Sequence, residues 1–145
     1  MALTIQRLTA PAPPQARTLF ARVWATSLPG HAPDFDTATA GEALYLAWQG
    51  TRLAGLASVW EPDRFLHFLF VDPATQRTGV GRALVAHLAA CYPPPLTLKC
   101  LRCNETALAF YRATGWRACG AGGAGLDAYV LLRYGEDTTL NQEVL

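Results

Sequence analysis

The sequence has few charges and no excess of either sign. Only 16% of its 145 residues are charged, and twelve Lys and Arg against eleven Asp and Glu leave a formal net charge of +1. Because like charges form no run, the sequence disfavours binding to nucleic acid through a basic patch. Lys99 is the single lysine, so the other basic residues are arginines, whose planar guanidinium groups suit phosphate. Local recognition of phosphate therefore stays open.

Long apolar segments are missing as well. No apolar stretch approaches the roughly 20 residues that span a bilayer. The segment Met1–Pro14 lacks the apolar core of a signal peptide. We therefore expect a soluble, cytoplasmic protein with no membrane partner.

Cysteine is scarce, and its spacing fits neither a zinc site nor a redox motif. Cys100 and Cys103 form a C-x-x-C pair, but the pair ends an apolar run instead of opening a helix after a strand. Cys91 and Cys119 are isolated, whereas a zinc site would want a second close pair. We expect reduced thiols and no metal, since a chain of this length builds a core without disulfides.

Apolar residues, in contrast, make up 51% of the chain, which is typical of one well-packed domain. A domain of about 150 residues buries roughly 68–70% of the surface that its unfolded chain exposes. Intrinsic disorder is therefore excluded. We expect a single domain over residues 1–134 and a polar tail over residues 135–145.

The hydrophobic periodicity predicts strands and helices in an α/β order. Strands are expected at 3–8, 43–49, 52–60, 65–71, 96–101, 116–119 and 128–133, and helices at 15–27, 80–91 and 104–114. The strands between 43 and 71 form an antiparallel meander, and a glycine-rich loop is expected at 120–125. Since the strand 65–71 is apolar on both alternating faces, we expect it to be central, with His67 as its single polar interruption.

A binding motif follows that central strand. The strand leads into a polar loop, then into Gln76-Arg77-Thr78-Gly79-Val80-Gly81, and then into a helix. This order offers successive backbone N–H groups and the positive end of a helix dipole to an anion. The longer loop and the lysine of a nucleotide triphosphatase are missing, so that function is excluded.

Two motifs resemble those of the GNAT family of N-acetyltransferases. Gln76-x-x-Gly79-x-Gly81 after Leu69-Phe70-Val71-Asp72-Pro73 resembles the family's acetyl-CoA signature, and Asn104-x-x-Ala107-x-x-Phe110-Tyr111, ending at Gly115-Trp116, resembles its N-x-x-A-x-x-F-Y…G-F segment. The order of the elements also agrees, so the resemblance covers nearly the whole domain.

The resemblance implies an α/β (α+β) fold with a mixed, mostly antiparallel sheet flanked by helices. Strands 65–71 and 96–101 would splay apart to form a cleft for acetyl-CoA, the implied co-substrate. Backbone groups of Leu69 and Val71 would pair with the pantetheine amides, and the amides of 77–82 would cradle the pyrophosphate. The implied cofactor-binding set is Leu69, Phe70, Val71, Gln76, Arg77, Thr78, Gly79, Val80, Gly81, Arg82, Asn104, Ala107 and Phe110.

The resemblance also implies catalytic residues. Tyr111 stands where the family places a tyrosine that protonates the departing CoA thiolate; its alternative role is packing. His67 resembles a histidine that arylalkylamine acetyltransferases use in proton removal, and imidazole titrates near neutral pH; a core histidine is the alternative. Glu61 stands where some members hold a carboxylate near the acceptor amine, or is simply a turn residue. The Leu69 N–H is the implied oxyanion donor.

These residues predict an enzyme that moves an acetyl group to the amine of a small molecule by direct attack in a ternary complex. Trp24, Asp34 and Trp60 are expected to line the acceptor site; otherwise they are ordinary core and turn residues. The alternatives are a protein or peptide N-acetyltransferase and a catalytically silent acyl-CoA-binding module. Homodimers are common in the family, although nothing in the sequence locates an interface.

Overall fold

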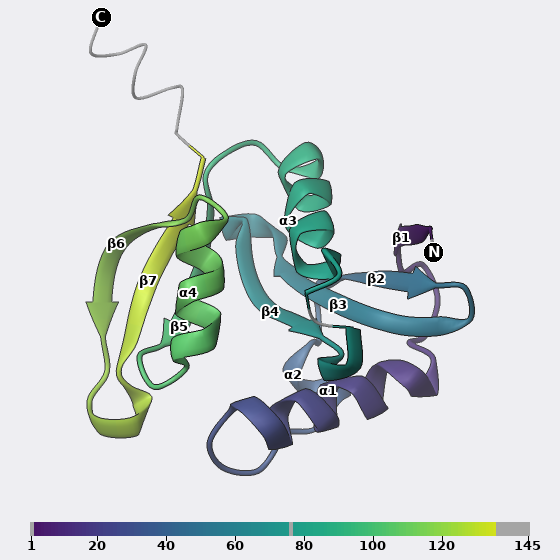
Figure 1. Cartoon of the computed structure of the whole chain (residues 1–145), viewed down its shortest axis with the longest axis horizontal. Coiled ribbons are helices and arrows are strands. Elements are labelled where there is room, and N and C mark those ends of the chain that lie inside the picture. The colour runs from purple at the N-terminus through teal and green to yellow at the C-terminus, as the bar shows by residue number, and fades with distance from the viewer. Residues whose placement is uncertain (1, 76, 136–145) are drawn as a thin grey trace, which may run out of the picture. The chain divides into compact units, whose positions relative to one another are not determined.

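The computed structural model of the chain describes residues 2–75 and 77–135 (Figure 1). These residues form two compact units, one ending at Leu88 and the other starting at Ala89. Each unit contains antiparallel strands and at least one helix, and each is described by itself below.

The first unit is built on a meander of four strands. They pair in the order β1-β2-β3-β4, each antiparallel to the strand that follows it along the chain. The elements are β1 (Leu3–Arg7), α1 (Pro14–Ser27), α2 (Phe35–Ala38), β2 (Ala43–Gln49), β3 (Arg52–Trp60), β4 (Phe65–Val71) and the start of α3 (Val80–Cys91).

Helix α1 packs on one face of this sheet (Figure 1). Its buried residues recur at intervals of three and four, which places them along one side of a helix: Ala16, Leu19, Phe20 and Val23. The ring centroid of Phe20 lies 5.1 Å from that of Phe68 and 5.3 Å from that of Phe70, both on β4. This aromatic cluster fixes α1 against the strand that carries His67.

Helix α3 starts on the opposite face, where Gly55 of β3 permits its close approach. A Cβ added at Gly55 would lie only 2.9 Å from Val80 Cγ1 and 3.0 Å from Leu84 Cδ1. The first turns of α3 therefore rest directly on the backbone of β3, which sets the height of the helix start above the sheet.

Strand β4 bulges at His67. Ser58 of β3 pairs with Phe68 and Val59 pairs with Leu66, which leaves His67 as the extra residue on β4. A bulge disturbs the alternation of side chains, and the rings of His67 and its neighbour Phe68 stack with centroids 3.9 Å apart. The bulge therefore coincides with His67, the single polar residue of the strand.

The second unit has three strands and one helix. Its elements are β5 (Leu96–Leu101), α4 (Glu105–Ala113), β6 (Arg117–Gly122) and β7 (Tyr129–Tyr134), and β7 pairs antiparallel with both β5 and β6. The Asn104 side chain caps α4 by accepting a hydrogen bond from the Ala107 N–H at 3.2 Å.

One expected loop is in part a strand. Gly120 and Gly122 belong to β6 and pair with Leu131 and Tyr129 of β7, whereas the sequence predicts a loop from residue 120. A Cβ on Gly122 would collide with the Tyr129 ring. Glycine here makes room for a cross-strand tyrosine instead of ending the strand.

The predicted fold class, α/β with mostly antiparallel strands and flanking helices, is confirmed. Among the described residues, no helix has the length and apolar character needed to cross a membrane. The single-domain boundary and the splay of the strands at 65–71 and 96–101 stay predictions. Of the expected tail, all but Gly135 lies outside the described residues.

Candidate active site

The turn before α3 presents backbone N–H groups. Gly79 has a φ of 87°, and no heavy atom of a described residue beyond its two chain neighbours lies within 4 Å of the place of its missing Cβ. Glycine is therefore needed there for its backbone conformation and not to make room for a neighbour. The Gly79 carbonyl accepts the Ala83 N–H at 2.9 Å. The N–H groups of Val80, Gly81 and Arg82 belong to the first turn of α3, where backbone N–H groups have no acceptor within the helix itself. Such N–H groups favour an anion.

The other residues of the motif close this turn or flank it. The Thr78 hydroxyl donates to the Thr75 carbonyl. Arg77 has a φ of 68°, a left-handed conformation that is uncommon for a residue with a Cβ. The side chains of Arg77 and Arg82 are exposed. Gln76 lies outside the described residues.

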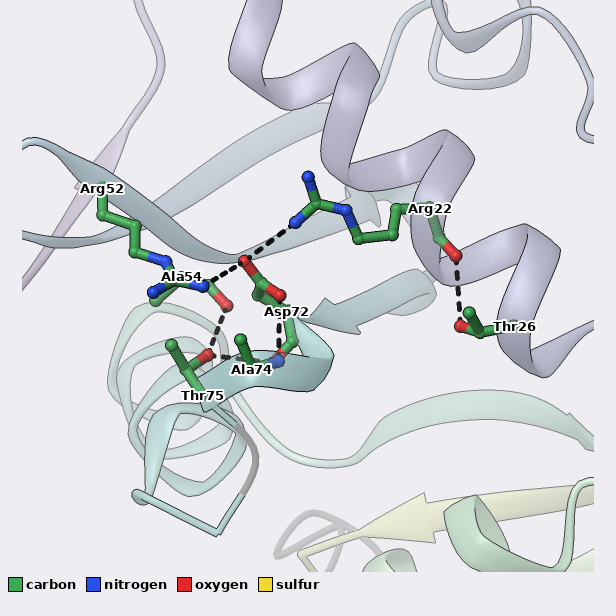
Figure 2. Close-up of polar contacts among 7 residues, drawn as sticks. All are labelled: Arg22, Thr26, Arg52, Ala54, Asp72, Ala74 and Thr75. Carbon is green, nitrogen blue, oxygen red and sulfur yellow. Dashed lines mark hydrogen bonds and ion pairs between the residues drawn. The ribbon is translucent and has the colours of Figure 1, made fainter.

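A buried carboxylate, Asp72, links the end of β4 to its surroundings (Figure 2). Its Oδ2 accepts hydrogen bonds from Arg22 of α1 at 3.2 Å and from Arg52 of β3 at 3.1 Å. Its Oδ1 accepts the Ala74 N–H at 3.0 Å, and its carbonyl accepts the Thr75 N–H at 2.8 Å. One side chain thus connects α1 and β3 to the turn that leads into α3.

These contacts favour the ionised form of Asp72. The side chain is only 5% exposed, and this burial acts to raise its pKa. The Ala74 N–H and the guanidinium groups of Arg52 and Arg22 outweigh burial and hold the pKa below its usual value. The turn is therefore anchored by a carboxylate that stays charged at neutral pH.

His67 is bonded to a carboxylate, not to a backbone carbonyl. Its Nδ1 lies 2.8 Å from Glu42 Oε2 and 3.0 Å from Glu42 Oε1. The Ser58 hydroxyl also bonds Glu42 Oε1, at 2.5 Å. The imidazole keeps 39% of its side-chain exposure, whereas the Glu42 side chain keeps 7%. His67 is therefore not the buried core residue of the alternative interpretation.

Glu61 has a cationic partner. It lies in the 3₁₀ turn Glu61–Asp63 after β3, and its two carboxylate oxygens accept hydrogen bonds from the two terminal nitrogens of Arg7, each at 3.0 Å. Both side chains are substantially exposed. This arrangement suits a surface ion pair better than a base, since the guanidinium stabilises the unprotonated carboxylate.

The three residues expected at the acceptor site have different surroundings. Trp24 is half-buried and donates its indole N–H to the Pro29 carbonyl at 3.2 Å. Asp34 caps α2 by accepting the Thr37 N–H at 3.0 Å and the Thr37 hydroxyl at 2.8 Å. These bonds, the hydroxyl's first, lower its pKa. Trp60 is 41% exposed, and its ring lies 3.5 Å from the place of a Cβ on Gly41, beside Glu42.

The segment of β4 expected to pair with pantetheine lies beyond the bulge. Leu69, Phe70 and Val71 pair with Ala57, Leu56 and Gly55 of β3, respectively. Phe70 is buried, whereas Leu69 and Val71 are half-buried on the alternate side of the strand. The assigned roles of Leu69 and Val71 use backbone atoms and stay predictions.

In the second unit, Tyr111 is a buried residue of α4. Only 8% of it is exposed, and burial raises its pKa well above the ordinary value, with a smaller contribution from Cys100. Its ring packs against Phe110 and Trp116, at centroid distances of 5.3 and 5.6 Å. Asn104 uses its side-chain oxygen to cap α4. Packing and capping are thus observed, and the proposed chemical roles are compatible with both.

In the part of the chain that the structure describes, cysteines and the other residues that commonly bind metals do not form a cluster. Within residues 2–75 and 77–135, no three His, Cys, Asp or Glu side chains gather in a way that could hold a metal ion. Cys100 is buried as a free thiol, and burial raises its pKa to about 11, with a smaller contribution from Cys103. A protonated thiol is a poor nucleophile at neutral pH.

Sequence reasoning missed Glu42, Ser58 and the role of Asp72. Glu42 lies 16 residues from Ser58 and 25 from His67 along the chain. Only the register of the sheet, including the bulge, brings these three together. Asp72 directly follows β4 in the sequence, but its arginine partners come from elements that no local motif connects.

Comparison with known proteins settles the family. Residues 8–125 match the profile of the Acetyltransferase (GNAT) domain. The chain belongs to the GNAT acetyltransferase family. The resemblance seen in the two motifs is thereby confirmed.

Two curated relatives from Escherichia coli (strain K12) are peptidyl-lysine N-acetyltransferases. YiaC is 37% identical over 65 residues, which are 45% of this chain and 43% of that protein. YjaB is 42% identical over 52 residues, which are 36% of this chain and 35% of that protein. This GNAT chain therefore matches less than half the length of either relative.

Solved structures share the fold at low identity. The ribosomal-protein-S18-alanine N-acetyltransferase from Escherichia coli superposes with a TM-score of 0.72 at 22% identity, covering 92% of this chain and 93% of its own. The PaiA N-acetyltransferase from Thermoplasma acidophilum, solved with coenzyme A, gives 0.71 at 14% identity, covering 92% and 100%. Both superpositions show that this chain has the GNAT fold.

Replacing Asp72 with Asn should lower the free energy of unfolding by about 2 kcal/mol at neutral pH, because charge-assisted hydrogen bonds at a buried group are lost. The carboxylate's contribution is complete above its unfolded-state pKa near 3.8 and is lost as pH falls through the lower folded-state pKa. Urea unfolding from neutral pH to about pH 3 checks this, since the gap between wild type and variant should close only in the acid range.

Asp36→Asn is the matched control. Asp36 forms an exposed ion pair with Arg17, and removing it should cost less than about 1 kcal/mol. Equal destabilisation by the two variants would show that Asp72 does not anchor the turn.

Proposed function

We propose that this protein transfers the acetyl group of acetyl-CoA to a primary amine by direct attack in a ternary complex. The observation that carries the proposal is the start of α3. There Gly79 adopts a positive φ and the N–H groups of Val80, Gly81 and Arg82 open the helix, directly after β4 and within the matched GNAT domain. The N–H groups of a helix start suit the pyrophosphate of CoA.

Relatives of the same fold support acetyl-CoA as the co-substrate. A GNAT acetyltransferase from Elizabethkingia anophelis was solved with acetyl-CoA bound, and the Thermoplasma enzyme with coenzyme A. In this chain, the exposed guanidinium groups of Arg77 and Arg82 would add charge-assisted hydrogen bonds to phosphate oxygens. The backbone N–H groups would bind the phosphates whatever those two side chains do.

His67 is proposed as the general base. An amine with a pKa near 10 is only about 0.1% neutral at pH 7, so attack on the thioester needs proton removal. His67 is partly exposed and lies on β4, the strand assigned to the thioester by the family resemblance. Glu61, which is paired with Arg7, is the weaker candidate.

Tyr111 is proposed as the acid. The amine nitrogen forms a bond to the carbonyl carbon, the C–S bond breaks with its electron pair on sulfur, and the Tyr111 hydroxyl donates its proton to the thiolate. Because burial raises the pKa of Tyr111, the hydroxyl stays protonated at neutral pH. The net products are an amide, free CoA thiol and one released proton.

Two classes of acceptor have support. The exposed Trp60 ring beside Gly41 favours a small amine with apolar character, which is our first candidate. The two curated relatives are named as peptidyl-lysine acetyltransferases, which favours a lysine side chain as the second. We further propose that 1–134 is one domain, since the family match spans both units. A cytoplasmic location stays a prediction.

A panel of acceptors tests the reaction and its substrate class. Wild-type protein with acetyl-CoA should acetylate aromatic or aliphatic small amines, with a mass gain of one acetyl group and one free thiol per turnover. Lysine-containing and N-terminal peptides are tested beside them. Faster acetylation of lysine peptides would select the second candidate, and no thiol release with any amine would contradict acetyl transfer.

Replacing Tyr111 with Phe should lower kcat by roughly 100-fold, the usual size of an acid-catalysis effect, because the proton donor to the thiolate is lost. The Kd for acetyl-CoA should stay within about threefold, since the ring and its packing are kept. Steady-state kinetics and calorimetry separate the two effects. Tyr134→Phe, in the same unit and packed on Trp116, is the control. An unchanged kcat in Tyr111→Phe would return Tyr111 to a packing role.

A further inference from the structure

We propose that Glu42 is the positioning residue for His67, holding its imidazole in the tautomer that leaves Nε2 as the proton acceptor. This inference rests on the proposed function, in which His67 is the base. Glu42 belongs to neither sequence motif, and it reaches His67 only through the folded sheet.

The contact with Glu42 determines which ring nitrogen of His67 carries the proton. A carboxylate only accepts hydrogen bonds, so the nitrogen that faces it must carry the proton. Nδ1 of His67 lies 2.8 Å from Glu42 Oε2 and 3.0 Å from Oε1, and the neutral ring therefore carries its proton on Nδ1. The lone pair is then on Nε2, and the carboxylate balances the charge when Nε2 takes up a proton.

Glu42 is itself held in place. Its side chain is 7% exposed, and the buried Ser58 hydroxyl donates to Oε1 at 2.5 Å. Its backbone N–H donates to the Thr39 carbonyl at 3.0 Å, which fixes the residue between α2 and β2. The carboxylate is therefore oriented by neighbours that do not depend on His67.

The ring of His67 is fixed from a second direction. The β4 bulge lets it stack on Phe68, at a centroid distance of 3.9 Å. Phe68 in turn packs edge-on against Phe20 of α1 at 5.1 Å. Stacking sets the plane of the imidazole and Glu42 sets its rotation, yet 39% of the side chain remains exposed.

The tautomer is measured directly by nitrogen NMR of the imidazoles. The chain has only three histidines, so the His67 signals are identified by their loss in His67→Gln. With its ring neutral, wild-type His67 should show a protonated Nδ1 and an unprotonated Nε2. In Glu42→Ala the proton should move to Nε2 in a substantial fraction of molecules. A wild-type His67 protonated on Nε2 would overturn the proposal, whatever the activity.

Kinetics supply the second readout. Glu42→Gln, which keeps shape but loses charge, should lower kcat by about 10- to 100-fold while the Kd for acetyl-CoA changes less than about twofold. Ser58→Ala should lower kcat less than Glu42→Gln does. If Glu42→Ala does not fold, Glu42→Gln and Ser58→Ala together provide the kinetic test. Asp36→Asn, an exposed carboxylate paired with Arg17, is the control that should keep wild-type kcat.

The outcomes separate this inference from the proposed function. An active wild type with normal kcat in Glu42→Gln and Ser58→Ala would overturn the role of Glu42 and leave acetyl transfer standing. A wild type that binds acetyl-CoA but acetylates no amine would overturn the proposed reaction, and the catalytic role of Glu42 with it. A selective loss of kcat together with the Nδ1-protonated ring supports both.

Discussion

The buried carboxylate of Asp72 is the contact on which the first unit's binding geometry depends. A charge that is almost fully removed from water must be compensated, and here two arginines and a backbone N–H do so. Because those partners come from α1, β3 and the following turn, compensation also fixes three segments relative to one another. The end of β4 and the following turn, Pro73–Thr75, are held by one residue (Figure 2).

A second constraint is the bulge of β4, which stands at the partly exposed side chain of His67. Without the extra residue, His67 and Phe68 would point to opposite faces of the sheet. With it, the imidazole stacks on Phe68 and meets a carboxylate that Ser58 holds. The bulge lies at His67 near the start of β4, and Asp72 directly follows the end of that strand. Strand β4 therefore connects the proposed base to the turn that leads into α3.

The elements and the glycine turn before α3 could be predicted from the sequence, since apolar spacing and glycine position are local signals. The extension of β6 through Gly120 and Gly122 could not, because the glycine at 122 makes room for a cross-strand tyrosine instead of ending the strand. Glu61 matched a family position, but its pairing with Arg7 depends on distant strands. The role of Glu42 could not be predicted either, because its contact with His67 joins residues that are 25 positions apart in the sequence. Local sequence patterns thus indicated where CoA is expected to bind. Only the folded sheet showed which residues surround His67, the proposed base.

The most direct test of the account is calorimetric titration of the wild-type chain with acetyl-CoA, with CoA and adenosine 3′,5′-bisphosphate as comparators. The account predicts saturable binding of acetyl-CoA and of CoA. It also predicts that a hundredfold excess over Kd raises the free energy of unfolding by about 2.7 kcal/mol. No heat and no thermal stabilisation with any of the three would contradict it, and the glycine turn before α3 would then be only a helix cap.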